Sequence, residues 1–189
     1  MTLRVSGKNM DVGEALRSRA ESHFEAVVRK YFDGGYDGHL TLSHDGAGYR
    51  ADCVVHLDSG AILQSGAQAG DASSAYEILA NTIENRLRRY NRKLKTHRRR
   101  NEEEAFFAQS YVLAAPEADE EVEPDFAPPV IAESTAHLRR LSVGEAVMEL
   151  DLAQSDVLVF RHAGHGGLNV VYRRADGNIG WIDPARGAP

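Results

Sequence analysis

The chain has 189 residues, 42% of them hydrophobic and 26% charged, and its formal net charge is −6. This length allows one ordinary domain or two small ones, and the composition is typical of a globular protein. No apolar run approaches the roughly 20 residues of a membrane-spanning helix, and the N-terminus lacks the apolar centre of a secretory signal, so we expect no membrane association. The single cysteine, Cys53, cannot form a disulfide within the chain, which favours a reducing cytoplasm.

The first hundred residues predict the order β-α-β-β-β-α. Alternating or β-branched residues mark the strands, and apolar positions at three- and four-residue steps mark a first helix that ends before Gly34. A second, longer helix begins after Asp71, a favourable N-cap residue. We therefore expect an α+β domain over residues 1–100, with both helices on one face of a four-stranded sheet. The expected strands are residues 3–7, 39–44, 49–57 and 61–69, and the first helix covers 12–32.

The second helix gathers most of the positive charge of the chain. Residues 86–100 contain nine Lys and Arg and no acid. A solvated helix face usually mixes both signs, so an acid-free run repels itself unless an anion relieves it. The apolar stripe predicted to pack on the sheet leaves basic residues on both of its flanks, an arrangement suited to phosphate contacts rather than to base reading. This helix is therefore a candidate RNA-binding element.

The charge balance changes sign directly after this helix. Residues 1–100 have a balance of +4, whereas residues 101–125 contain nine acidic residues and no basic one. Clustered acid and proline with few aliphatic residues cannot bury enough apolar surface to fold. We therefore predict a disordered linker over residues 101–130.

The last segment, residues 131–189, is predicted to be a small strand-rich α+β domain. Ser142 and Glu145 have the spacing of a capping box at the start of a short helix, and three strands are expected over residues 156–162, 168–174 and 179–183. About sixty residues bury a thin core, and such units often gain stability by oligomerising.

No catalytic, metal-binding or cofactor-binding constellation emerges from the sequence. His162 and His165 are separated by a glycine turn and have no evident third ligand, and Cys53 alternates with apolar residues on an expected strand. The clustered carboxylates lie in the predicted linker, where nothing holds two of them at a fixed separation. We expect a binding protein without cofactor or metal, and not an enzyme.

The sequence resembles the long-form ribosome hibernation-promoting factors, also called ribosome-associated inhibitors or sigma-54 modulation proteins. The resemblance rests on SGKNMDVGEALR (6–17), on ENRLRRYNRKLK (84–95), and on LSVGEAVMEL (141–150) with LNVVYRRADGNIGWIDP (168–184). It implies that the first domain binds the small ribosomal subunit, its 16S rRNA and neighbouring proteins, in the decoding region. There it would block the mRNA and tRNA sites and inhibit translation. It also implies that the last domain forms a homodimer that joins two 70S ribosomes into an inactive 100S particle in stationary phase or stress.

Carried onto this sequence, the resemblance assigns rRNA contacts to the second helix and to the end of the first strand. Arg92 joins the set because asparagine replaces nearby basic positions of the family. The predicted rRNA-binding residues are Lys8, Arg86, Arg88, Arg89, Arg92, Lys93 and Lys95. The predicted dimerisation residues are Val157, Val159, Val170 and Tyr172, with a place in the core of the domain as the alternative for each. An adaptor that binds double-stranded RNA, not dedicated to the ribosome, stays open as a second interpretation.

Overall fold

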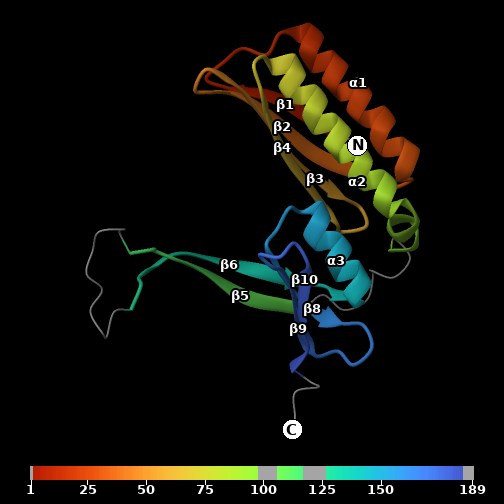
Figure 1. Ribbon diagram of the computed structural model, residues 1–189, viewed down its shortest axis with the longest axis vertical. Coiled ribbons are helices and arrows are strands. Elements are labelled where there is room, and N and C mark those ends of the chain that lie inside the picture. Colours follow the sequence, from red (N-terminus) through yellow and green to blue (C-terminus); the bar gives the residue numbers. More distant parts are fainter. Residues whose placement is uncertain (1, 98–105, 117–126, 185–189) are drawn as a thin grey trace.

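The computed structural model describes residues 2–97, 106–116 and 127–184, and Figure 1 shows the arrangement of their elements. The first domain contains a four-stranded sheet with the strand order β1-β2-β3-β4. β1 is parallel to β2, and the other neighbours are antiparallel. Its strands are β1 (Thr2–Lys8), β2 (Tyr36–Asp45), β3 (Gly48–Leu57) and β4 (Ile62–Ala69).

Two helices, α1 (Glu14–Tyr31) and α2 (Ala72–His97), cover one face of this sheet (Figure 1). The alternation predicted for β3 is confirmed, because Ala51, Cys53, Val55 and Leu57 are all buried toward the helices. Charged and polar contacts also tie α1 to α2: the Tyr31 hydroxyl donates to Glu84 over 2.9 Å, and Lys30 forms an ion pair with the same carboxylate at 2.9 Å. The α+β prediction for this domain is confirmed, with the helices on one side.

The C-terminal domain has a second sheet, of order β10-β9-β8-β7, with α3 (Val143–Leu152) packed against it. The predicted capping box is present: Ser142 Oγ accepts from the Glu145 amide, and the Glu145 carboxylate accepts from the Ser142 amide over 2.8 Å. A small cluster with Phe160 and Val171 at its centre forms the core. The strands are β7 (Arg140–Leu141), β8 (Val157–His162), β9 (Leu168–Arg173) and β10 (Ile179–Ile182).

The prediction of a disordered linker over residues 101–130 is wrong for residues 106–113. These residues form β5 (Phe106–Leu113), which pairs antiparallel with β6 (Val130–Leu138) in a two-stranded ribbon that projects from the C-terminal domain (Figure 1). The sequence FFAQSYVL is rich in aromatic and β-branched residues, and the acid that dominates the average composition of the region lies outside it. Residues 98–105 and 117–126 lie outside the described residues, so the linker prediction stays a prediction there.

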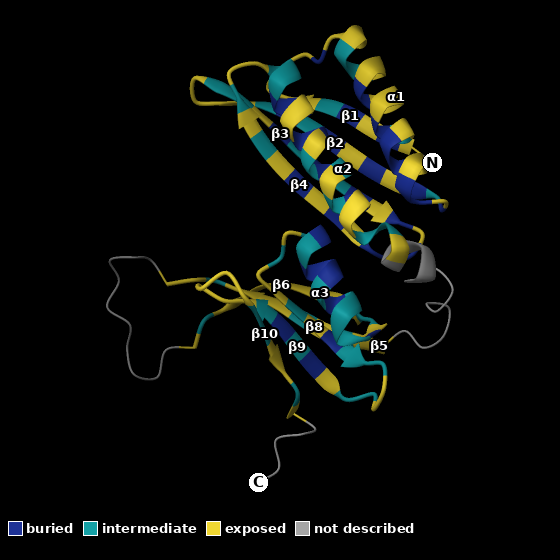
Figure 2. Ribbon diagram, turned by 45° about the vertical axis from the view of Figure 1, so that its right-hand side comes forward, coloured by how far each residue is buried: buried dark blue, intermediate teal, exposed yellow. Residues whose placement is uncertain are grey.

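The two domains contact each other through α3, which lies between the C-terminal sheet and the edge of the first domain (Figure 2). Met148 and Leu152 of α3 are fully buried in the apolar cluster of the first domain. None of the helices in the described ranges is long and apolar enough to span a bilayer.

Candidate nucleic-acid interface

The orientation of α2 is fixed at both its start and its apolar face. Asp71 caps the helix as predicted, since its carboxylate accepts from the Ser74 amide over 2.9 Å. Along the helix, Tyr76, Leu79, Ile83 and Leu87 are fully buried against the sheet. Because this stripe faces inward, the basic residues of α2 lie on its two flanks.

Arg88 and Arg92 are the predicted contacts on the outer flank, and both are exposed. Arg88 Nη2 donates to the side-chain oxygen of Asn85 over 3.0 Å, one turn earlier on the helix. This local contact leaves the guanidinium at the surface, where it can reach an anion. The two residues are four positions apart and therefore lie on the same side of the helix, one turn from each other.

Arg86 and Arg89, on the other flank, have protein partners. The half-buried Arg86 donates through Nη1 to the Gln64 carbonyl of β4 over 2.8 Å, and its partial burial lowers the pKa of its guanidinium. Arg89 Nη1 donates to Asp151 of α3 over 2.9 Å. The Tyr90 hydroxyl donates to the same carboxylate oxygen over 2.9 Å. In this conformation, Arg89 is therefore engaged by the C-terminal domain.

Lys8, Lys93 and Lys95 complete the predicted set. Lys93 and Lys95 lie on the last turns of α2, but their side chains lie outside the described residues. Lys8 is exposed at the end of β1, the strand at the opposite edge of the sheet from β4. Lys8 pairs with Ser43, at the end of the sheet where α2 begins. Arg86, in the second half of α2, instead donates to Gln64, which lies toward the other end of β4. The fold does not bring Lys8 together with the basic half of α2.

The four predicted dimerisation residues lie on one face of the C-terminal sheet as two cross-strand pairs. Val157 is opposite Tyr172, and Val159 is opposite Val170. The neighbouring positions on the same strands, Phe160 and Val171, are buried in the α3 core, so these pairs occupy the other face. Val157 and Val159 are 52% and 42% exposed, and the other two are half-buried. We call this four-residue surface the valine face.

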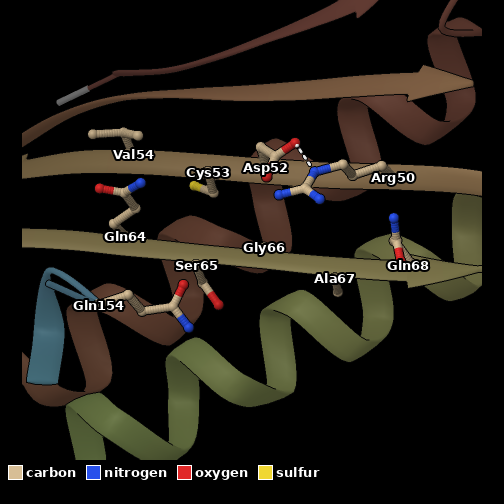
Figure 3. A pocket seen from close by; sticks show the side chains of 10 residues that line it. All are labelled: Arg50, Asp52, Cys53, Val54, Gln64, Ser65, Gly66, Ala67, Gln68 and Gln154. Carbon is tan, nitrogen blue, oxygen red and sulfur yellow. Dashed lines mark hydrogen bonds and ion pairs between the residues drawn. The ribbon is translucent and has the colours of Figure 1, made fainter. Parts of the chain in front are cut away.

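A hollow of about 310 Å³ lies along β3 and β4 (Figure 3). Arg50 and Asp52 form an ion pair at its rim over 2.7 Å, beside the small Gly66. Cys53 also lines the hollow, but burial raises the pKa of its thiol to about 12. At neutral pH this thiol is protonated, so the hollow presents an ion pair and amides rather than an activated nucleophile. The part of the chain described here also gathers no three metal-binding side chains at one place.

The Cys53 thiol should react very slowly with a disulfide reagent in the folded protein. Only the thiolate attacks, and a pKa of about 12 leaves on the order of one thiolate in 10⁴ at pH 8. We expect modification at least 100-fold slower than that of the same chain in denaturant, as measured by absorbance of the released thiol. Rapid modification of the native protein would contradict the buried position.

Comparison with known proteins matches both domains. Residues 3–95 match the family described as "Sigma 54 modulation protein / S30EA ribosomal protein", and residues 125–180 match its "C terminus". The chain is 50% identical over 195 residues to the "Ribosome hibernation promotion factor" of Bradyrhizobium diazoefficiens, covering 99% of this chain and 96% of the relative. The chain belongs to the ribosome hibernation promotion factor family. The resemblance predicted from the sequence motifs is thus confirmed.

A second ribosome hibernation promotion factor, from Rhizobium meliloti, is 47% identical over 186 residues, covering 98% of each chain. Among solved structures, the N-terminal domain of Thermus thermophilus Protein Y matches with a TM-score of 0.42 and 24% identity, covering 46% of this chain and 94% of that one. Hibernation promotion factors are ribosome-associated proteins and not enzymes, so the family membership confirms the prediction of a non-enzymatic protein.

Proposed function

We propose that this hibernation promotion factor binds the small ribosomal subunit through α2 and blocks the mRNA and tRNA sites of the decoding region. The observation that carries the proposal is the solvent-facing basic surface of Arg88 and Arg92 on a helix half that contains no acid. The apolar stripe holds this surface outward on a rigid helix, so guanidinium groups reach phosphates without rearrangement of the core. A protein that works at the ribosome would act in the cytoplasm.

The shape of this surface favours structured RNA as the ligand. A convex helix flank can contact the phosphates on the surface of a folded RNA. Proteins recognise folded RNA largely by its shape and by the positions of its phosphates. Lys8, at the far end of the sheet, would contact a second site on the same rRNA rather than extend the α2 surface. The exposed part of the interface is therefore expected to gain its affinity mainly from charge.

We further propose that the valine face pairs with its copy on a second chain, so that two bound ribosomes are joined into an inactive 100S particle. Val157 and Val159 expose apolar surface on a two-pair strip that α3 does not cover. Exposed apolar surface of this kind is a common feature of protein interfaces. The small core of this domain gains from the added burial. Such pairing would be useful in stationary phase or stress, when translation is stopped.

Ribosome binding should weaken steeply as salt is raised. If about six cations engage phosphates, the logarithm of the binding constant should fall against the logarithm of salt concentration with a slope of about −4 to −5. Cosedimentation with purified ribosomes between 50 and 300 mM KCl measures this slope. Duplex RNA at the same phosphate concentration as the ribosomes serves as the competitor: if it displaces the protein, the protein is a general RNA adaptor and the proposal fails.

A further inference from the structure

The helix α3 is apolar on two opposite sides. Ala146 and Leu150 pack into the small cluster of the C-terminal domain, while Met148 and Leu152 are fully buried in the cluster of the first domain. Positions two apart on a helix point in nearly opposite directions, so the two pairs define two separate faces. A short helix that is apolar on two opposite sides must be covered on both of them. Here the first domain covers the second side (Figure 2).

Polar contacts beside α3 fix the position of the C-terminal domain on the first domain. Arg139 Nη2 donates to the Ser59 carbonyl, in the β3–β4 turn, over 2.7 Å. Its Nη1 forms an ion pair with Glu149 of α3 at 2.6 Å, and the two side chains are only 13% and 9% exposed. The next residue of the turn is Gly60, at a φ of +78°, where a Cβ would lie 3.0 Å from the guanidinium carbon. Because Gly60 has no side chain, the turn leaves space for the Arg139 guanidinium.

The carboxylate of Asp151, at the end of α3, binds the predicted RNA-binding helix directly. One oxygen accepts from Arg89 Nη1 and from the Tyr90 hydroxyl, each over 2.9 Å. The other oxygen accepts from Arg173 Nη2 over 3.4 Å. A carboxylate and a phosphate oxygen make the same charge-assisted hydrogen bonds to a guanidinium. Asp151 therefore occupies one donor of Arg89 that an rRNA phosphate would otherwise use, while the side chain as a whole stays 61% exposed.

We infer that the C-terminal domain is an intramolecular inhibitor of α2: docked through α3, it holds Arg89 on Asp151, and it must leave before α2 can bind rRNA fully. The inference rests on the proposed function of α2. Docking and rRNA binding compete for the same guanidinium, so the apparent affinity for the ribosome falls as the fraction of docked chains rises. Binding to the ribosome in turn would release the C-terminal domain from the first domain, whereas the valine face, on the side opposite α3, is exposed even when the domain is docked.

The test compares four versions of the full-length chain: the unchanged protein, Asp151→Asn, Met148→Gln and Asp156→Asn. Asp151→Asn removes the charge that holds Arg89, and Met148→Gln weakens the apolar half of the same interface. Asp156 is an exposed carboxylate of the same domain that lies outside α3. Asp156→Asn therefore removes one negative charge, as Asp151→Asn does, without removing the contact to Arg89. Fluorescence anisotropy measures the affinity of each for purified small subunits at 100 mM KCl. Hydrogen exchange in the absence of ribosomes measures the protection of β4 and α3.

Both interface variants should bind small subunits about five- to tenfold more tightly than the unchanged protein and should lose protection in β4 and α3. Asp156→Asn should match the unchanged protein in both measurements. A gain of affinity cannot come from misfolding, since an unfolded variant would bind less.

Two results would overturn the inference, and they are distinguishable. If the unchanged protein binds small subunits and both interface variants bind equally well, docking does not restrain α2, while the proposed function stands. If no version binds small subunits, the proposed function itself fails and the inference fails with it.

Discussion

Reversing the charges of Arg88 and Arg92 together, as Arg88→Glu with Arg92→Glu, should weaken ribosome binding at least about 100-fold at 100 mM KCl. Both guanidinium groups are exposed on the outer flank of α2, and neither is the one that Asp151 holds. Each lost phosphate contact should also reduce the salt slope by about 1, and the introduced carboxylates add repulsion. Because these side chains lie outside the core, the fold should be retained.

Cosedimentation at several salt concentrations measures this loss, and circular dichroism checks the helix content. The matched control is Arg29→Glu with Arg174→Glu, which changes the net charge by the same amount at exposed positions outside α2 and removes only their local ion pairs with Glu25 and Asp176. That control should retain most of the affinity. An equal loss in both variants would mean that overall charge, rather than the surface of α2, drives binding.

Introducing charge into the valine face, as Val159→Asp with Val170→Asp, should abolish ribosome pairing and leave ribosome binding unchanged. The two residues face each other across β8 and β9 on the side opposite α3. In a symmetric dimer these substitutions bury four carboxylates, two from each copy, at a cost of several kcal/mol. The α3 side of the sheet is untouched, so the domain should keep its core.

Analytical ultracentrifugation of the ribosome complexes measures the fraction of paired particles. The control is Ile62→Asp, which places a carboxylate at a comparably exposed apolar residue, 39% accessible, in the first domain. Pairing should survive that change. Paired particles formed by the Val159/Val170 variant would place the dimer interface elsewhere.

The sequence predicted most of the fold because local patterns and tertiary packing agree there. The alternation of Cys53 with its neighbours identified β3, and the Ser142–Glu145 capping box identified the start of α3. The prediction failed at β5, where an apolar strand lies within an acidic region and the acid- and proline-rich residues 114–129 separate it from its pairing partner, β6. Composition averaged over thirty residues conceals an eight-residue strand.

The candidate site was only partly accessible to sequence reasoning. The charge run identified α2, and helical periodicity correctly separated its flanks. The engagement of Arg89 by Asp151 depends on how two domains dock, which no local pattern encodes. One signal was present: Met148 and Leu152 make α3 apolar on a second side, and an apolar second side indicates a second partner.

The most direct test of the proposed function is a sucrose gradient of ribosomes incubated with the full-length protein near 100 mM KCl. We expect the protein to migrate with the ribosomes and part of the ribosome population to shift to a heavier peak containing two ribosomes. The reverse pattern, with the protein at the top of the gradient and the ribosome profile unchanged, would contradict the proposed function.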